Sequence, residues 1–101
     1  MEEFGCRQIV FSSSATVYGA ADKMPITEDT TIGAGITNAY GRTKYMIEEI
    51  LGDFYRSTKN SENPWAVTVL RYFNPVGAHP SGTFTKDKRF YIFLNYIIFD
   101  F

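Results

Sequence analysis

Tyr40 and Lys44 stand four positions apart in the stretch AYGRTK, residues 39–44. If this stretch is helical, the two side chains lie one turn apart on the same face of the helix. An ammonium beside a phenol favours the phenolate, so the pKa of the phenol, ordinarily about 10, would move toward neutrality. Enzymes that oxidise alcohols with a nicotinamide need such a base. The spacing alone indicates one only weakly, because Tyr-x-x-x-Lys also occurs in helices where the two residues share no role.

The segments around this pair predict a strand, a long loop, a helix and a second strand. Residues 8–11 are a short apolar run that ends in three serines, Ser12, Ser13 and Ser14. Residues 65–72 form a second run rich in β-branched residues. Apolar strands without alternation are typical of a parallel sheet that is buried on both faces. The stretch at residues 20–37 is irregular, and loops of that length are usually functional or disordered.

The helix between the strands is expected from about Ala39 to Tyr55, with Thr37 or Asn38 as its N-cap. Five apolar residues with helical spacing are expected to form its packed face: Met46, Ile47, Ile50, Leu51 and Phe54. The charged residues are expected mainly on the other side: Glu48, Glu49, Asp53 and Arg56. Tyr40 and Lys44 would then lie at the N-terminal end of the packed face.

Strand, helix and strand in this order make a βαβ unit, in which both parallel strands end at the same edge of the sheet. Ser12–Ser14 and Phe73–Asn74 would therefore lie together at that edge, where open α/β sheets bind ligands. The helix N-terminus with Tyr40 would lie at the same edge. The spacing leaves an alternative open, in which a serine-rich turn, a structural helix and a proline turn have no common purpose.

Composition and charge exclude several classes of protein. The 101 residues allow at most one small domain, and 45% apolar content argues against disorder over the whole length. A net charge of -1 with scattered basic residues gives no support to a nucleic-acid partner. The single cysteine, Cys6, excludes an internal disulfide and is compatible with a reducing compartment such as the cytoplasm, and the single histidine, His79, excludes a His/Cys metal cluster. The longest apolar run, residues 90–99, is too short to cross a membrane, so no membrane partner is expected.

Three blocks of the sequence closely resemble the UDP-glucose 4-epimerase family, which belongs to the extended short-chain dehydrogenase/reductase superfamily. The blocks are FSSSATVYG at residues 11–19, YGRTK at residues 40–44 and LRYFNPVGAHPSG at residues 70–82. They occur in the family's order and at nearly its separations, and the resemblance covers about residues 7 to 82. The Tyr-x-x-x-Lys block is common to the superfamily, whereas the other two are far more specific. Nucleotide-sugar dehydratases typically carry an acidic residue where this chain has Ala15 or Thr16, which counts against them.

The resemblance implies catalytic roles for Tyr40, Lys44 and Ser14. Tyr40 would take the proton from the sugar 4-hydroxyl, and Lys44 would hydrogen-bond the nicotinamide ribose and lower the pKa of the phenol. Ser14 would share a proton with the same sugar oxygen. The reaction implied is hydride transfer from the fourth carbon of a UDP-hexose to NAD, rotation of the 4-keto sugar and return of the hydride to its opposite face.

The resemblance also implies binding residues. Phe73 and Tyr72 would lie along the nicotinamide pocket, and Asn74 would contact the nucleotide sugar. The residues expected to contact NAD are Ser12, Ser13, Tyr40, Lys44, Tyr72 and Phe73, and those expected to contact substrate are Ser14, Tyr40 and Asn74. The family is homodimeric, and the helix beginning near Tyr40 helps form its dimer interface. A chain of this length is not expected to form the whole dimer, although it could pair with longer subunits.

The sequence also departs from the family. It contains no glycine-rich phosphate loop, since Gly33 and Gly35 are followed by Asn38 where a third glycine is needed and no strand precedes them. The fold expected is therefore α/β and partial: a βαβ unit of the doubly wound parallel sheet of an NAD-binding Rossmann fold, incomplete at both ends. Residues 1–82 would be the C-terminal part of that domain. Residues 83–101 are expected to be an aromatic-rich tail foreign to the family fold, with a β-strand or an interface segment as the competing interpretation.

Two further functions stay open. The chain could belong to another nucleotide-sugar epimerase or a decarboxylase of the same superfamily, because the residues that size the sugar pocket lie elsewhere. It could also be a truncated product without catalytic function, and we expect little or no activity from the 101 residues alone.

Overall fold

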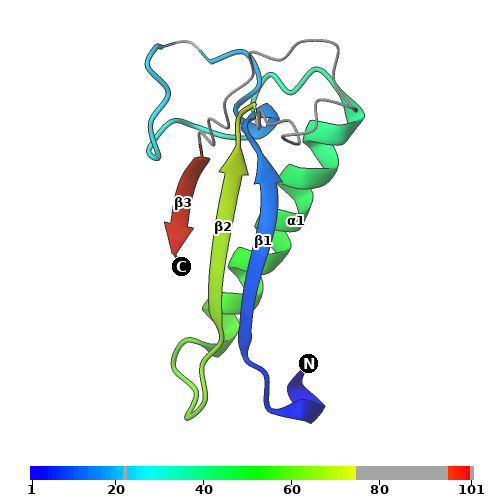
Figure 1. Cartoon of the computed structure of the whole chain (residues 1–101), viewed down its shortest axis with the longest axis vertical. Coiled ribbons are helices and arrows are strands. Elements are labelled where there is room, and N and C mark those ends of the chain that lie inside the picture. Colours follow the sequence, from blue (N-terminus) through cyan, green and yellow to red (C-terminus); the bar gives the residue numbers. More distant parts are fainter. Residues whose placement is uncertain (22, 75–95, 101) are drawn as a thin grey trace, which may run out of the picture.

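The computed structural model describes residues 1–21, 23–74 and 96–100, with side chains up to Asn74. In these residues the chain forms, in order, η1 (Glu2–Phe4), β1 (Gln8–Ser14), η2 (Ala15–Tyr18), α1 (Ala39–Thr58), β2 (Ala66–Tyr72) and β3 (Tyr96–Asp100). β1 and β2 run parallel, and α1 connects them along one face of the sheet (Figure 1). The predicted βαβ unit is confirmed.

The two parallel strands are paired over their whole length. The register runs from Gln8 opposite Ala66 to Ser14 opposite Tyr72, so the two strands end level with each other. The loop that follows β1 and the N-terminal end of α1 lie beyond this edge, at the top of Figure 1. The predicted meeting of the serines with the end of the second strand is therefore confirmed.

The core lies between α1 and the sheet. Trp65, Val67 and Val69 are buried there, and four partly buried residues pack against them: Ile9, Phe11, Leu51 and Tyr55. Full burial of a valine side chain stabilises a fold by about 1.5–3 kcal/mol. The opposite face of β1 carries no helix within the described residues, and Val10 on that face is 65% exposed.

The ends of α1 follow the sequence signals closely. Of the two predicted N-caps, Asn38 is the one observed, because its side-chain Oδ1 accepts a hydrogen bond from the Gly41 amide at 2.6 Å. The helix ends at Thr58, one turn beyond the predicted Tyr55. The extra turn is supported by hydroxyl groups near its end, which donate to helix carbonyls.

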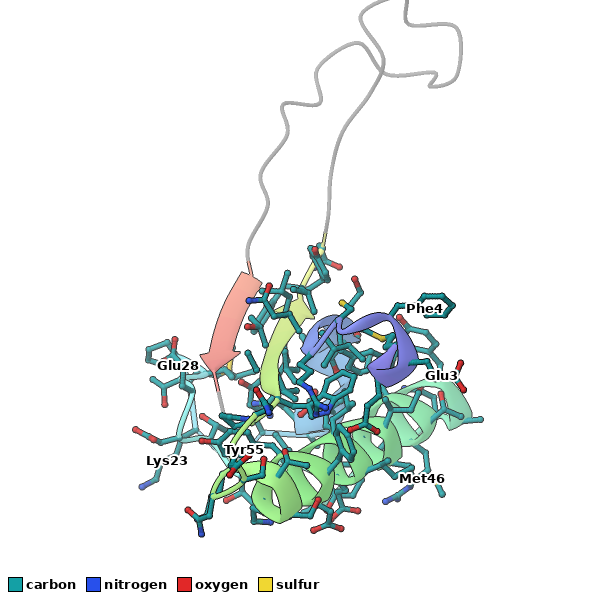
Figure 2. All side chains as sticks on the ribbon, turned by 90° about the horizontal axis from the view of Figure 1, so that it is seen from below. Glu3, Phe4, Lys23, Glu28, Met46 and Tyr55 are labelled. Carbon is teal, nitrogen blue, oxygen red and sulfur yellow. The ribbon has the colours of Figure 1, made fainter. Side chains whose placement is uncertain are left out.

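The predicted orientation of α1 was wrong. Four of the five apolar residues assigned to the packed face are exposed: Met46, Ile47, Ile50 and Phe54. Figure 2 shows Met46 pointing away from the sheet. The buried positions of the helix are Gly41, Glu48 and Gly52, so a carboxylate placed by sequence on the outer side is 3% exposed. Gly41 lets the helix lie close to η2, since a Cβ there would come within 3.0 Å of the Thr16 carbonyl oxygen. Glu48 is tolerated inside because it is paired with Arg71.

β3 is the one described element in the tail. It pairs antiparallel with β2, with Tyr96 opposite Tyr72 and Asp100 opposite Thr68, and the sheet order is β1-β2-β3. Residues 96–100 thus adopt the strand that was the competing interpretation. The predicted domain boundary at residue 82, and the part of the family block at residues 75–82, lie outside the described residues, so the origin of the tail stays a prediction.

Within the described residues, no helix combines the length and apolar character needed to cross a bilayer. The same residues hold no group of three or more His, Cys, Asp or Glu side chains that could bind a metal ion.

Candidate active site

Tyr40 and Lys44 lie together at the first turns of α1, beside the end of β1. The Lys44 Nζ donates a hydrogen bond of 2.8 Å to the main-chain carbonyl of Ser12. The same ammonium lies 5.5 Å from the centre of the Tyr40 ring and 4.9 Å from the centre of the Phe11 ring. Both distances are within the range of cation–π attraction. Tyr40 itself is 56% exposed, so its phenol is open to a ligand at the edge of the sheet.

Ser14 ends β1 and caps η2. Its Oγ accepts hydrogen bonds from the Thr16 amide at 3.2 Å and from the Thr16 hydroxyl at 3.0 Å. A hydroxyl oxygen accepts two bonds and donates one, so Ser14 can still donate its own hydrogen. Thr16 in turn lies against α1, because a Cβ on Gly41 would come within 3.0 Å of the Thr16 carbonyl oxygen. Ser14 therefore reaches the turn of α1 that carries Tyr40 through a single intervening residue.

The end of β2 contributes Tyr72, Phe73 and Asn74. Tyr72 and Phe73 are half-buried and Asn74 is exposed. The Phe73 ring lies 6.3 Å from the ring of Tyr18, which is buried at the end of η2. The three predicted residues thus lie at the same edge as Ser14, since Tyr72 is its register partner.

A buried charged network beneath this edge was missed in the sequence. Arg71 on β2 and Glu48 on α1 form an ion pair at 2.6 Å with side chains that are 4% and 2% exposed. The Arg71 Nε donates to both oxygens of Glu48 at 3.1 Å. The Ser13 hydroxyl donates to the same carboxylate, and the Arg71 Nη1 donates to the Tyr18 hydroxyl at 2.9 Å.

The charge state of this network follows from its contacts. Burial by itself lowers the pKa of the Arg71 guanidinium, but the bonds to Glu48 and Tyr18 outweigh burial and raise the pKa above its usual value. Arg71 is therefore charged at every accessible pH. Its position could have been found by alternation, because it continues the inward-facing series Val67 and Val69 on the strand. Glu48 lies four residues after Lys44, on the same stripe of the helix.

Ser13 differs from the other serines of the block. Its side chain is 3% exposed, and its hydroxyl is engaged by Glu48 on the helix side of the sheet. Any contact of Ser13 with a ligand would therefore come from its main chain.

Two hollows open in the described surface away from Tyr40. One, of about 390 Å³, is lined by Tyr45, Glu48 and Arg71 among others, and a second, of about 540 Å³, lies in the loop after η2. Ser14, Tyr40 and Lys44 line neither of them. The candidate site is therefore defined by the convergence of side chains at the strand ends.

The βαβ unit with its Tyr-x-x-x-Lys pair at the carboxyl edge of the sheet fits the short-chain dehydrogenase/reductase class. The chain belongs to the NAD dependent epimerase/dehydratase family, whose pattern it matches over residues 1–96.

The chain is similar to UDP-glucose 4-epimerases over most of its length. It is 55% identical over 87 residues to the UDP-glucose 4-epimerase of Bacillus subtilis, covering 86% of this chain and 24% of that protein. It is 54% identical over 87 residues to UDP-glucose 4-epimerase 2 of Arabidopsis thaliana, covering 86% and 23%. The chain thus spans about a quarter of the length of the curated relatives it matches.

Solved structures agree with this assignment. The crystal structure of UDP-glucose 4-epimerase from Bifidobacterium longum in complex with NAD+ and UDP matches with a TM-score of 0.69 and 49% identity, covering 81% of this chain and 23% of that one. The match confirms the predicted partial Rossmann-type fold.

Proposed function

We propose that this chain supplies the catalytic residues of an NAD-dependent UDP-glucose 4-epimerase. The observation that carries the proposal is the Lys44 ammonium, held on the Ser12 carbonyl at 2.8 Å beside the ring of an exposed Tyr40. A phenol and a fixed cation thus lie beside the carboxyl ends of β1 and β2, and open α/β sheets bind ligands at such ends. The relatives of known name support the reaction and the substrate class.

Each residue has a role that its geometry supports. Tyr40 exchanges the proton of the sugar 4-hydroxyl, because its phenol is exposed at the edge. Ser14 hydrogen-bonds the same sugar oxygen with the hydrogen that Thr16 leaves free. Asn74, exposed at the end of β2, contacts the nucleotide sugar.

The residues also fit the nicotinamide end of NAD. Lys44 has N–H donors left after its bond to Ser12, and these would be available to the ribose hydroxyls of a bound NAD. Tyr72 and Phe73 offer half-buried aromatic surface, and Ser12 and Ser13 line the strand end. When bound, NAD would take a hydride from the sugar and return it. The sequence has no glycine-rich loop for the pyrophosphate, so this chain's contribution is to the reacting end.

A chimera tests the proposal without depending on the missing length. Residues 7–74 would replace the matching stretch of the Bacillus subtilis relative, which is 55% identical to this chain. We expect the chimera to convert UDP-galactose to UDP-glucose, and Tyr40→Phe to lower kcat by about 10²–10⁴-fold. The matched control is Tyr45→Phe on the same helix, whose phenol donates to Glu49 and should leave kcat unchanged.

Two outcomes would contradict the proposal. One is a folded chimera, by circular dichroism and NAD content, that has no turnover. The other is a Tyr40→Phe chimera as active as its Tyr45→Phe control. The 101-residue chain alone is expected to show little or no turnover, because substrate positioning is worth about 7–11 kcal/mol of the barrier and depends on the whole protein.

A pentose substrate is the second candidate. One relative, from Pisum sativum, is named a bifunctional UDP-glucose 4-epimerase and UDP-xylose 4-epimerase and is 48% identical to this chain over 89 residues. One matching structure, from Stenotrophomonas maltophila, contains NAD and formylated UDP-arabinopyranose. A chimera whose kcat/KM for UDP-xylose rises relative to that for UDP-galactose, compared with the parent enzyme, would favour this candidate.

A further inference from the structure

The network of Ser13, Glu48, Arg71 and Tyr18 joins four elements directly beneath the proposed site. Ser13 is on β1, Glu48 on α1, Arg71 on β2 and Tyr18 at the end of η2. Ser13 and Arg71 are register partners on adjacent strands, and both side chains reach the same carboxylate from the face that α1 covers. No other described ion pair is buried to this degree, since each of the remaining two has at least one side chain that is more than half exposed.

Stability alone does not account for such a network. Taking two charges out of water costs several kcal/mol per ion, and well-packed apolar residues of similar volume often serve a fold as well or better. Hydrogen bonds are more directional than apolar contacts, so the network adds a constraint on the angle and offset of the elements that it joins. The bidentate contact of a guanidinium with a carboxylate is directional, and here both oxygens of Glu48 are engaged.

The network adjoins the part of the proposed site formed by Lys44 and the end of β1. α1 touches β1 through two polar contacts that are one helical turn apart: Lys44 to the carbonyl of Ser12, and Glu48 from the hydroxyl of Ser13. Two neighbouring strand residues thus contact two helix residues that are four positions apart. A helix held at two such points cannot rotate or slide along the strand without breaking one of them.

The other arm of the network reaches the end of β2. Arg71 directly precedes Tyr72 and Phe73, and it donates to the hydroxyl of Tyr18. The guanidinium carbon lies 5.0 Å from the centre of the Tyr18 ring, and that ring lies 6.3 Å from the ring of Phe73. The same buried carboxylate therefore influences the placement of the helix and of the strand end.

We propose that Glu48, with Arg71 and Ser13, is a positioning residue that sets the Lys44 ammonium and the Tyr40 phenol against the end of the sheet. This inference rests on the proposed function, because it assigns the alignment of the same site. Displacing reacting groups by about 1 Å can lower a rate by about 10²-fold, so loss of the network should act on kcat. Binding of NAD and substrate should change much less.

The test uses the active chimera and its variants Glu48→Gln and Glu48→Asp. Glu48→Gln keeps the shape and removes the charge, whereas Glu48→Asp keeps the charge and withdraws the carboxylate by one methylene. We expect both to lower kcat for UDP-galactose by about tenfold or more with KM and NAD content nearly unchanged. The appearance of reduced nicotinamide in a single turnover should slow by the same factor.

Two controls separate positioning from loss of stability. Glu49→Gln makes the same substitution one residue along, at an exposed site, and should leave kcat unchanged. Val67→Ala removes two core methyl groups from a strand position far from the edge, and should lower the melting temperature without lowering kcat.

The inference is overturned if kcat of the Glu48 variants, corrected for folded protein, equals that of Val67→Ala. If Glu48→Gln fails to fold, Ser13→Ala decides, because it removes one hydrogen bond and leaves the ion pair. A fall in kcat with full NAD content supports positioning, and a fall only in NAD content contradicts it. Failure of the proposed function is distinguishable, since Tyr40→Phe would then be as active as the chimera.

Discussion

The buried pair of Glu48 and Arg71 makes a quantitative prediction about stability. Replacing Glu48 with Met leaves the Arg71 guanidinium uncompensated at a position where its side chain is 4% exposed. Replacing both residues with Met removes the two charges together. Glu48→Met alone should therefore lower the stability, and adding Arg71→Met to it should raise the stability again.

The structure sets the size of the effect. Removing one partner of a buried pair costs about 3–5 kcal/mol, against a total stability of about 5–15 kcal/mol for a domain. The double variant should regain about 2 kcal/mol or more of this loss. Recovery stays incomplete because the hydroxyls of Ser13 and Tyr18 lose their partner, at about 1–3 kcal/mol for each buried group left unsatisfied. Adding Ser13→Ala and Tyr18→Phe should restore part of the remainder.

The chain carries its own probe for the assay. Trp65 is the single tryptophan, is 7% exposed and makes an edge-on contact with Phe54 at 5.0 Å between ring centres. Urea unfolding followed by Trp65 fluorescence should show the midpoint of Glu48→Met falling by about 1 M or more, given slopes of about 1–3 kcal/mol per molar urea.

Equal midpoints for Glu48→Met and for the double variant would refute the reasoning, because they would mean that the two charges do not interact. If Glu48→Met has no folded baseline, the same comparison is made in Glu48→Gln, which preserves the side-chain volume. A Gln variant as stable as the parent would be equally damaging.

Other variants test separate features. Asn38→Ala should lower the unfolding free energy by about 0.5–2 kcal/mol through loss of the α1 cap, and Thr37→Ala, the control, should not, both by urea titration. The bond from Tyr45 to Glu49 raises the pKa of the Tyr45 phenol, so this bond stabilises the fold below the ordinary tyrosine pKa and is lost as pH rises through the raised one. A spectrophotometric titration of Glu49→Gln should show the pKa of Tyr45 returning to the ordinary range of tyrosine. Ile50, 64% exposed on the apolar outer face of α1, should be a subunit contact, and sedimentation of an Ile50→Glu chimera should show loss of a dimer; a chimera that sediments unchanged would exclude that face.

The parts of the candidate site that depend on spacing along the chain could be predicted from the sequence. The pair Tyr40 and Lys44 is four residues apart in any helix, and Asn38 is a strong N-cap wherever a helix begins. The end of the block at Ser14 and the end of the second strand at Tyr72 meet because parallel strands joined by a helix end at one edge. These conclusions need no knowledge of which side chain touches which.

The rotation of α1 is where local reasoning failed. Its apolar stripe was assigned to the core, yet Met46, Ile47 and Ile50 face outward and Glu48 faces inward. Periodicity locates an apolar face but does not say whether the sheet or another surface covers it. The partner of the buried Glu48 is the guanidinium of Arg71, which lies 23 residues away in the chain, beyond the reach of helical periodicity.

The sequence by itself determined the order of elements, the edge where the candidate site residues lie and the turn of helix that carries Tyr40 and Lys44, because these follow from local spacing and from the βαβ connection. Only the tertiary structure decided that Lys44 rests on the Ser12 carbonyl, that Ser13 turns to the helix and that Glu48 is buried. Those facts depend on the register of β1 against β2 and on the contacts that hold α1 against the sheet. Contacts of that kind join segments far apart in the chain, and no local pattern encodes them.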